Sequence, residues 1–226
     1  MSLVAHAITA APAGPIAAPG LRDRALAVAE AAGLAMWSTP LGGTEAFERA
    51  DVLDHHRIVE RICAAQPCLP VRFGTTFADE SLARASLEKR AAQLRESLGR
   101  VSGKTELALT LLWRDSGGSD PALVPGAGPG RRYLEERRAE YADREMRRRR
   151  AHELVERIVA DLAIDRSLVW HDTCTSAAVA VSLAALVPAA EAQARKAQLA
   201  RIGAGFADVT AVVNGPWPPY TFAGTE

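Results

Sequence analysis

The chain has 226 residues, with 27 lysine plus arginine and 27 aspartate plus glutamate residues, so its formal net charge is zero. This balance provides no overall attraction to nucleic acid or to an anionic membrane surface. Hydrophobic residues make up 48% and aromatic residues 5% of the chain, which predicts a core built mainly of Ala, Leu and Val. The longest apolar run, residues 177–190, is too short to cross a bilayer. The N-terminus lacks the basic region of a signal peptide and is expected to form a strand.

The first part of the chain alternates strand and helix patterns. Residues 105–113 alternate in side-chain character with a period of two, which is the clearest strand pattern of the sequence. Asp79 is placed to cap a helix, and Thr44 to cap an earlier one. In chain order, the sequence predicts a strand over residues 1–9, a short Ala-rich helix at 22–32, a strand at 34–41, helix 45–66, a short edge strand at 68–74, helix 79–103 and strand 105–113.

A change of composition divides the chain. Residues 115–130 are rich in Gly, Ser, Pro and Ala, which is typical of a linker. We therefore expect an N-terminal α+β domain over residues 1–114 and a C-terminal domain over 131–226. The second domain is predicted to contain a long charged helix at 131–164, a hairpin of residues 168–174 and 178–187, a helix at 189–202 and a strand at 208–213. Strands and helices are mixed in both halves, which indicates two small α+β layers.

Cysteine and histidine positions give little support for a metal site. The chain has an odd number of cysteines without CxxC spacing, namely Cys63, Cys68 and Cys174. This argues against a disulfide framework or a zinc site, and it favours a reducing cytoplasm. His55 and His56 have no second ligand pair one helical turn away, so exposed or half-buried surface positions are expected for both. No cofactor or metal is predicted.

Three patterns leave other classes of protein open. His171 and Cys174 would suit a small-molecule enzyme with a cysteine nucleophile, although residues 171 and 174 fall on opposite faces of a strand. Arg147–Arg150 would suit nucleic acid, but residues 131–163 carry ten arginines and eight acidic residues, which favours ion pairs on a solvated helix face. Gly126–Gly130 could cradle a phosphate, but it follows a linker and not a strand.

A rigid aromatic strip, Asn214–Phe222, lies near the C-terminus. Three prolines fix the backbone and remove three N–H donors, so the strip is not expected to continue a β-ladder. It can clamp its own domain or dock a partner, and its position after a final strand favours the clamp. The predicted clamp residues are Pro216, Trp217, Pro218, Pro219 and Tyr220.

Four short blocks in register identify a family resemblance. They are Leu69–Thr75, Gly103–Leu107, Gly128–Leu134 and Gly215–Phe222. Together they resemble the GvpF/GvpL family of gas vesicle proteins over almost the whole chain. The sequence departs from the family in lacking an aromatic-rich first strand and in having an arginine-rich long helix.

The resemblance implies a fold and a role. The implied fold is α+β with two small ferredoxin-like domains, the second a modified version preceded by a long helix. The implied function is that of a non-enzymatic accessory or minor structural protein of the gas vesicle, in the cytoplasm. Such a protein is expected to bind the main shell protein GvpA, and further accessory proteins are candidate partners. It is expected to assist gas vesicle nucleation and assembly. A free sheet edge could cap a shell subunit before it joins the wall, and Pro70, Arg72 and Phe73 mark the expected partner-binding edge.

Overall fold

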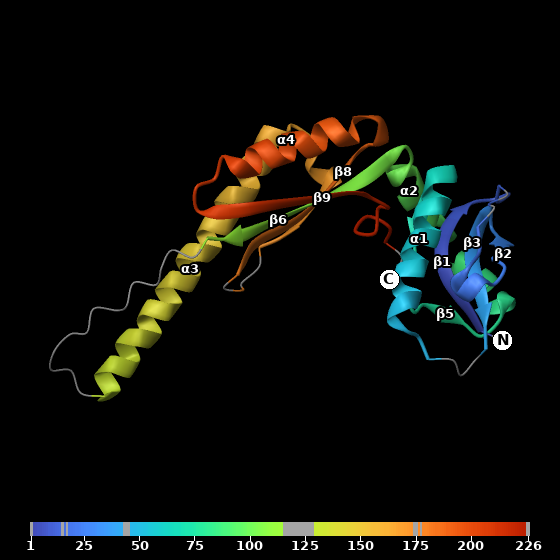
Figure 1. The fold of residues 1–226 in the computed structure, drawn as a ribbon, viewed down its shortest axis with the longest axis horizontal. Coiled ribbons are helices and arrows are strands. Elements are labelled where there is room, and N and C mark those ends of the chain that lie inside the picture. Colours follow the sequence, from blue (N-terminus) through green and yellow to red (C-terminus); the bar gives the residue numbers. More distant parts are fainter. Residues whose placement is uncertain are drawn as a thin grey trace. The chain divides into compact units, whose positions relative to one another are not determined.

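The structure is a computed structural model that describes residues 2–14, 16, 18–42, 46–114, 129–173, 176 and 178–224 (Figure 1). The chain divides into two compact units, Met1–Glu106 with Pro216–Glu226, and Leu107–Gly215. The helices and strands are β1 (Ser2–Ala10), β2 (Ala27–Ala31), β3 (Leu34–Leu41), α1 (Arg49–Ala65), β4 (Cys68–Pro70), β5 (Thr76–Phe77), α2 (Glu80–Val101), β6 (Lys104–Trp113), α3 (Pro129–Leu162), β7 (Val169–Asp172), β8 (Val179–Pro188), α4 (Ala192–Ala204) and β9 (Val209–Trp217).

The first unit contains an antiparallel sheet with strand order β2-β3-β1-β4, and β5 pairs with another part of β1. All of β3 except Pro40 is buried, so both of its faces are covered. Ile58 and Ile62 of α1 pack against Val4 and Trp37 of the sheet. Helix α2 contacts β2, β3 and β4. Its N-cap is Asp79, whose carboxylate accepts a hydrogen bond from the Leu82 N–H at 2.9 Å, as the sequence predicts.

Three predictions about the first unit are wrong. Residues 22–32 form no α-helix, because residues 27–31 pair with β3 through a tight Ala32–Gly33 turn in which both φ angles are positive, and only a short 3-10 helix, Leu21–Asp23, precedes them. Helix α1 begins at Arg49 with Glu48 as its N-cap, and the expected cap Thr44 lies outside the described residues. Cys63 and Cys68 form a disulfide, because the turn from α1 into β4 brings their Cα atoms to 5.2 Å.

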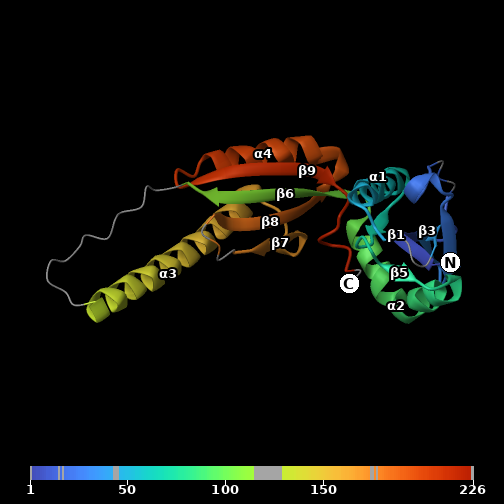
Figure 2. The same cartoon turned by 60° about the horizontal axis from the view of Figure 1, so that its bottom comes forward.

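The second unit has an antiparallel sheet with strand order β7-β8-β6-β9. One apolar cluster joins the sheet to α3 and α4, so both helices cover the same face (Figures 1 and 2). The period of two in β6 has the expected effect, since Leu107, Leu109 and Leu111 are fully buried in this cluster. The predicted hairpin is confirmed by the antiparallel pairing of β7 and β8.

Helix α3 changes character along its length. From Ala151 onward one side is buried, whereas the described side chains from 133 to 149 are exposed or half-buried. This agrees with the sequence, in which only the C-terminal half of the long helix is strongly amphipathic.

The division of the chain differs from the predicted halves. It falls within β6 and β9, at 106/107 and 215/216, and it groups residues 216–226 with the first unit. Most of the expected linker, residues 115–128, lies outside the described residues. Strand β9 continues through Pro216 to Trp217, so the prediction that the prolines exclude the strip from a strand is wrong over residues 214–217. A proline is tolerated there because it lies one residue from the end of β9, directly after Gly215, whose φ is +105°.

Candidate partner-binding surface

A buried histidine pair joins α1 to the first sheet. The Nδ1 atoms of His6 on β1 and His55 on α1 are 2.9 Å apart. His55 Nε2 lies 3.0 Å from the Val71 carbonyl oxygen, and His6 Nε2 lies 2.7 Å from Thr39 Oγ1. Since the carbonyl can only accept, His55 donates from Nε2 and accepts at Nδ1 from His6, while His6 Nε2 accepts from the threonine hydroxyl. All four ring nitrogens are satisfied when both rings are neutral.

Burial keeps this pair neutral. It lowers the pKa of His6 to about 3, with a further contribution from neighbouring His55, and it lowers the pKa of His55 to about 4. The expectation that His55 lies on the surface is therefore wrong: its side chain is buried, and only His56 is half-buried at the surface.

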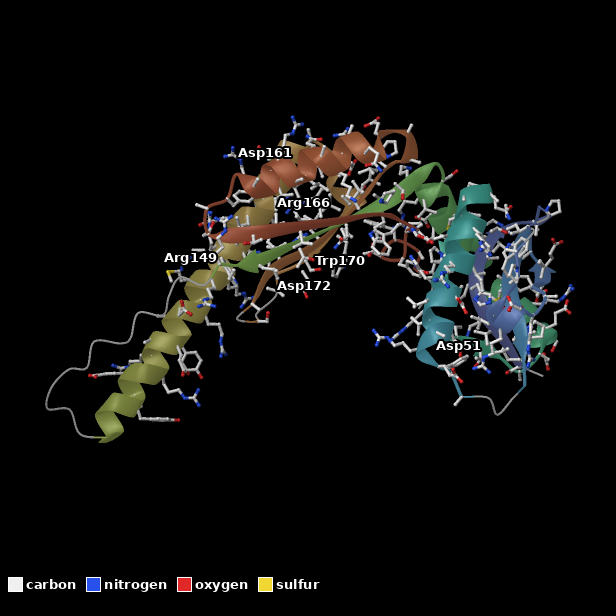
Figure 3. All side chains as sticks on the ribbon, in the orientation of Figure 1. Asp51, Arg149, Asp161, Arg166, Trp170 and Asp172 are labelled. Carbon is white, nitrogen blue, oxygen red and sulfur yellow. A yellow bond between two sulfur atoms is a disulfide. The ribbon has the colours of Figure 1, made fainter. Side chains whose placement is uncertain are left out.

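An ion pair fixes the N-terminal end of α1. Arg22 donates from Nη2 to Asp51 Oδ2 at 2.7 Å and from Nε to Oδ1 at 3.1 Å. The same carboxylate accepts from the Glu48 N–H at 2.8 Å, which completes a capping box (Figure 3 labels Asp51). Hydrogen bonding from Arg22 holds the pKa of Asp51 below its usual value. Helix α1 is thus anchored at its start by this ion pair and along its inner face by His55.

The opposite side of α1 carries apolar side chains in solvent. Val52 is 46% and Leu53 57% exposed, and both lie one turn before His56. Leu53 lies on the side away from the buried positions, whereas Val52 lies at the border, two turns before buried Val59. Just before the helix, the exposed Phe47 ring contacts Phe73 edge-to-face, with ring centroids 4.9 Å apart. We call Phe47, Val52, Leu53 and His56 the α1 outer face. Their exposure on a firmly anchored helix makes them a candidate binding surface.

The C-terminal strip extends this surface. The Trp217 ring lies 5.2 Å from the His56 ring, and Trp217 remains 38% exposed. Tyr220 stacks on His56 at 6.1 Å. Glu106 accepts hydrogen bonds from the Thr221 N–H and hydroxyl, both at 2.8 Å. The strip is therefore tied to β6 at Thr221, while part of Trp217 faces solvent.

The predicted site residues fall into different environments. Pro70 is buried on β4, which ends the described first sheet, so its own surface is not available to a partner. Arg72 is exposed and Phe73 is half-buried against Phe47 and His55. Of the predicted clamp residues, Pro218 and Pro219 are buried, Tyr220 is half-buried, and Pro216 and Trp217 are exposed.

The residues that left other classes of protein open belong to the second unit. His171 is half-buried on β7, next to Asp172, which Figure 3 labels, and Cys174 lies outside the described residues. Arg147 pairs with Asp143, and Arg150 pairs with Asp208 and Glu153, in agreement with the expected ion pairs. Residues 126–128 of the glycine run are not described. In the described part of the chain no group of three or more His, Cys, Asp or Glu side chains is placed to hold a metal ion.

Sequence reasoning missed two parts of this surface. The His6–His55 contact joins residues 49 positions apart, and the only local sign was a histidine within the apolar first strand. The exposed side of α1 was also missed: the spacing of Val52 to Val59 and Ile62 groups it with the apolar stripe of the helix, and Leu53 stands opposite Ile58 and Ile62.

The fold and this surface define a two-unit α+β protein that offers an apolar and aromatic surface. No helix among the described residues is long and apolar enough to span a membrane. The family model of the gas vesicle synthesis protein GvpL/GvpF matches residues 3–224, so the chain belongs to this family. The family is structural or accessory and not enzymatic.

Solved structures agree with this assignment. The crystal structure of the gas vesicle protein GvpF from Microcystis aeruginosa has a TM-score of 0.76 to this chain at 16% sequence identity, covering 98% of each chain. That of GvpF from Anabaena sp. PCC7120 has a TM-score of 0.75 at 19% identity, again covering 98% of each chain. These similarities show a shared fold. No curated protein sequence matches the chain significantly.

Proposed function

We propose that this protein is an accessory or minor structural protein of the gas vesicle that binds the main shell protein GvpA and assists vesicle nucleation and assembly. It acts at the gas vesicle, in the cytoplasm. Family membership supports a role in gas vesicle formation. The α1 outer face is the observation that supports binding, because it exposes Val52 and Leu53 on an anchored helix and Phe47 just before it.

The chemistry of this surface suits a hydrophobic shell subunit. A self-assembling subunit exposes apolar surface before it joins the wall, and an apolar partner surface can cover it in the meantime. Trp217 adds an amphipathic ring of the kind that is enriched in binding hot spots. Arg72 and Phe73, next to Phe47, extend the proposed contact toward the end of β4.

We also propose a structural role for the clamp residues. Pro218 and Pro219 are buried, and Thr221 is bound to Glu106, so this part of the strip can hold Trp217 in place beside His56. Under this proposal Trp217 belongs to the contact, and the four residues Pro216, Pro218, Pro219 and Tyr220 support it.

The ferredoxin-like description fits the two units unequally. In the second, the order β6-α3-β7-β8-α4-β9 with sheet order β7-β8-β6-β9 supports a ferredoxin-like interpretation. The first unit has a hairpin of β2 and β3 where that pattern has a helix and a strand, so it is at most a modified form.

Co-purification of tagged protein with GvpA tests the proposed function. We expect Leu53→Glu to reduce retained GvpA at least tenfold, because it places a charge in the centre of the apolar contact. The matched control is Leu82→Glu, which changes a leucine of similar exposure, 51%, on α2 of the same unit. It should retain GvpA.

Two outcomes would contradict different parts of the proposal. If the intact protein retains no GvpA, the proposed function is wrong. If Leu53→Glu and Leu82→Glu retain equal amounts, GvpA binds elsewhere and the α1 outer face is the wrong surface. A thermal unfolding curve for each variant separates lost binding from lost folding.

A further inference from the structure

Strand β9 ends the second sheet with an edge that lacks the usual protection. No other described strand pairs with its outer side, since the strand order is β7-β8-β6-β9. The strand is nine residues long and contains no charged side chain from Val209 to Trp217. Natural edge strands are usually short, charged, bulged or covered, because a free edge can pair with another chain. Apart from Gly215, whose φ is +105°, and Pro216 near its end, β9 has no such device in its sequence.

Alternate residues of β9 direct their backbone groups outward. The arrows of β6 and β9 point in opposite directions in both ribbon views, so the two strands are antiparallel (Figures 1 and 2). The Arg114 N–H donates to the Asp208 carbonyl oxygen at 3.0 Å, which places the even-numbered residues in the ladder with β6. Ala211 and Val213 therefore direct their N–H and C=O groups to the outer edge.

A groove runs beside this edge. It has a volume of about 490 Å³ and lies between α4 and β9, with Ala197 and Ala200 on the helix side and Ala211 and Val213 on the strand side. Helix α4 lies against β9 at Gly203, where an added Cβ would lie 2.4 Å from the Ala211 Cβ. Toward the start of α4, small side chains leave room for a further extended chain beside the edge.

The charges of the groove indicate what can occupy it. Lys196 Nζ donates to the Gly215 carbonyl oxygen at 2.6 Å, near one end of the edge. Arg114 donates to Thr210 Oγ1 at 3.3 Å and to the Ala207 carbonyl oxygen at 3.1 Å, near the other end. No carboxylate lines the groove among the described residues. Lysine has three donors and arginine five, so both cations retain donors for a ligand.

We propose that the outer edge of β9 and the α4 groove bind an extended segment of a partner protein by β-strand addition. The segment has small or β-branched uncharged residues in its centre and carboxylate side chains five to six residues apart. The carboxylates meet Lys196 and Arg114, which are separated along β9 by about five residues, or roughly 17 Å at the rise of a strand. The N–H and C=O groups of Ala211 and Val213 form the hydrogen bonds between β9 and the added strand.

Charge disfavours a second copy of this chain as the occupant. Antiparallel pairing of two β9 strands would bring the Thr210 end of one edge to the Gly215 end of the other. Arg114 would then meet Lys196 of the second copy, twice in a symmetric pair, and like charges at that distance repel. An acidic strand avoids this repulsion, so a different partner fits the groove better.

A fluorescein-labelled peptide, Glu-Val-Thr-Val-Thr-Val-Glu with blocked ends, tests the site on the full chain by fluorescence anisotropy. We expect it to bind at least tenfold more tightly than the same peptide with Lys in place of both Glu residues. Lys196→Glu should weaken binding at least fivefold. Arg201→Glu is the matched control, since Arg201 is an exposed residue of α4 that does not line the groove, and it should bind within twofold of the unchanged protein.

Amide hydrogen exchange identifies the binding mode. Strand addition should slow exchange at Ala211 and Val213 at least tenfold, and should leave Val212 unchanged because its N–H already faces β6. The proposal is overturned if the acidic peptide does not bind, if both peptides bind equally, or if Lys196→Glu has no effect. It is also overturned if sedimentation shows a dimer in which these two amides are already protected, because a second copy then fills the edge.

Discussion

The interior of the first unit differs in kind from that of the second. Every buried polar or charged side chain among the described residues lies in the first unit: His6, Thr9, Ser38, Thr39, Asp51, His55, Ser97 and Glu106. The core of the second unit is a single cluster of Leu, Val, Ile and Ala side chains. Buried polar groups tie particular residues together, whereas an apolar cluster depends on filled volume. The first unit should therefore respond to pH, and the second mainly to lost side-chain volume.

Loss of volume in the second unit should have the largest effect. Leu154 of α3 is fully buried in the cluster, so Leu154→Ala should lower the free energy of unfolding by about 2–5 kcal/mol. Native-state hydrogen exchange can assign the loss to this unit through the amides of β6 and β8. The difference from the unchanged protein should be the same at pH 5 and pH 7, because no titratable group is involved. A pH-dependent difference would contradict the comparison.

Acid should weaken the first unit selectively. The pKa values of His6 and His55 are lowered to about 3 and about 4, so the neutral rings stabilise the folded state at neutral pH. A histidine in the unfolded chain has a pKa of about 6.5. As the pH falls below this value, the unfolded chain binds protons that the folded unit does not bind, and the free energy of unfolding declines until the folded histidines titrate near pH 3–4. At pH 5 the expected loss is on the order of 2 kcal/mol for each histidine.

Hydrogen exchange at pH 5 and pH 7, corrected for the intrinsic rate, measures this loss in β1 and α1. Glu106 acts in the opposite sense, because burial raises its pKa and so favours the folded state at lower pH. His6→Asn combined with His55→Gln should flatten the dependence, even if the variant is less stable overall. An equally steep loss in this double variant would show that other groups cause it.

The sequence predicted the elements whose local pattern agrees with their final environment. Strand β6 alternates because only one of its faces meets the helices, and Asp79 caps α2 through a bond within three residues. Residues 27–31 were mistaken for helix because their alanine content is a local signal, while their strand pairing depends on β3. The His6–His55 contact and the Cys63–Cys68 disulfide depend on how α1 lies against the sheet, which local patterns do not encode.

The aromatic strip gives a smaller expected effect. Truncation of a fully buried tryptophan costs about 3–5 kcal/mol, but Trp217 is 38% exposed, with its ring beside that of His56. We therefore expect Trp217→Ala to lower the free energy of unfolding of the first unit by about 1–2 kcal/mol. Denaturant unfolding measures this. A loss near 4 kcal/mol would show that Trp217 is a buried clamp after all, and would remove it from the proposed contact with GvpA.

The smallest effect should come from the exposed half of α3, and it sharpens the contrast with Leu154 on the same helix. Tyr141 is 65% exposed, and the Arg144 guanidinium carbon lies 6.0 Å from its ring centre. Since an exposed cation–π contact contributes at most about 0.5–1 kcal/mol, Tyr141→Ala should change the free energy of unfolding by less than about 1 kcal/mol. The same denaturant titration compares the two variants. If Tyr141→Ala cost as much as Leu154→Ala, the first turns of α3 would have to be packed against something in solution, and their exposed side chains would no longer count as free surface.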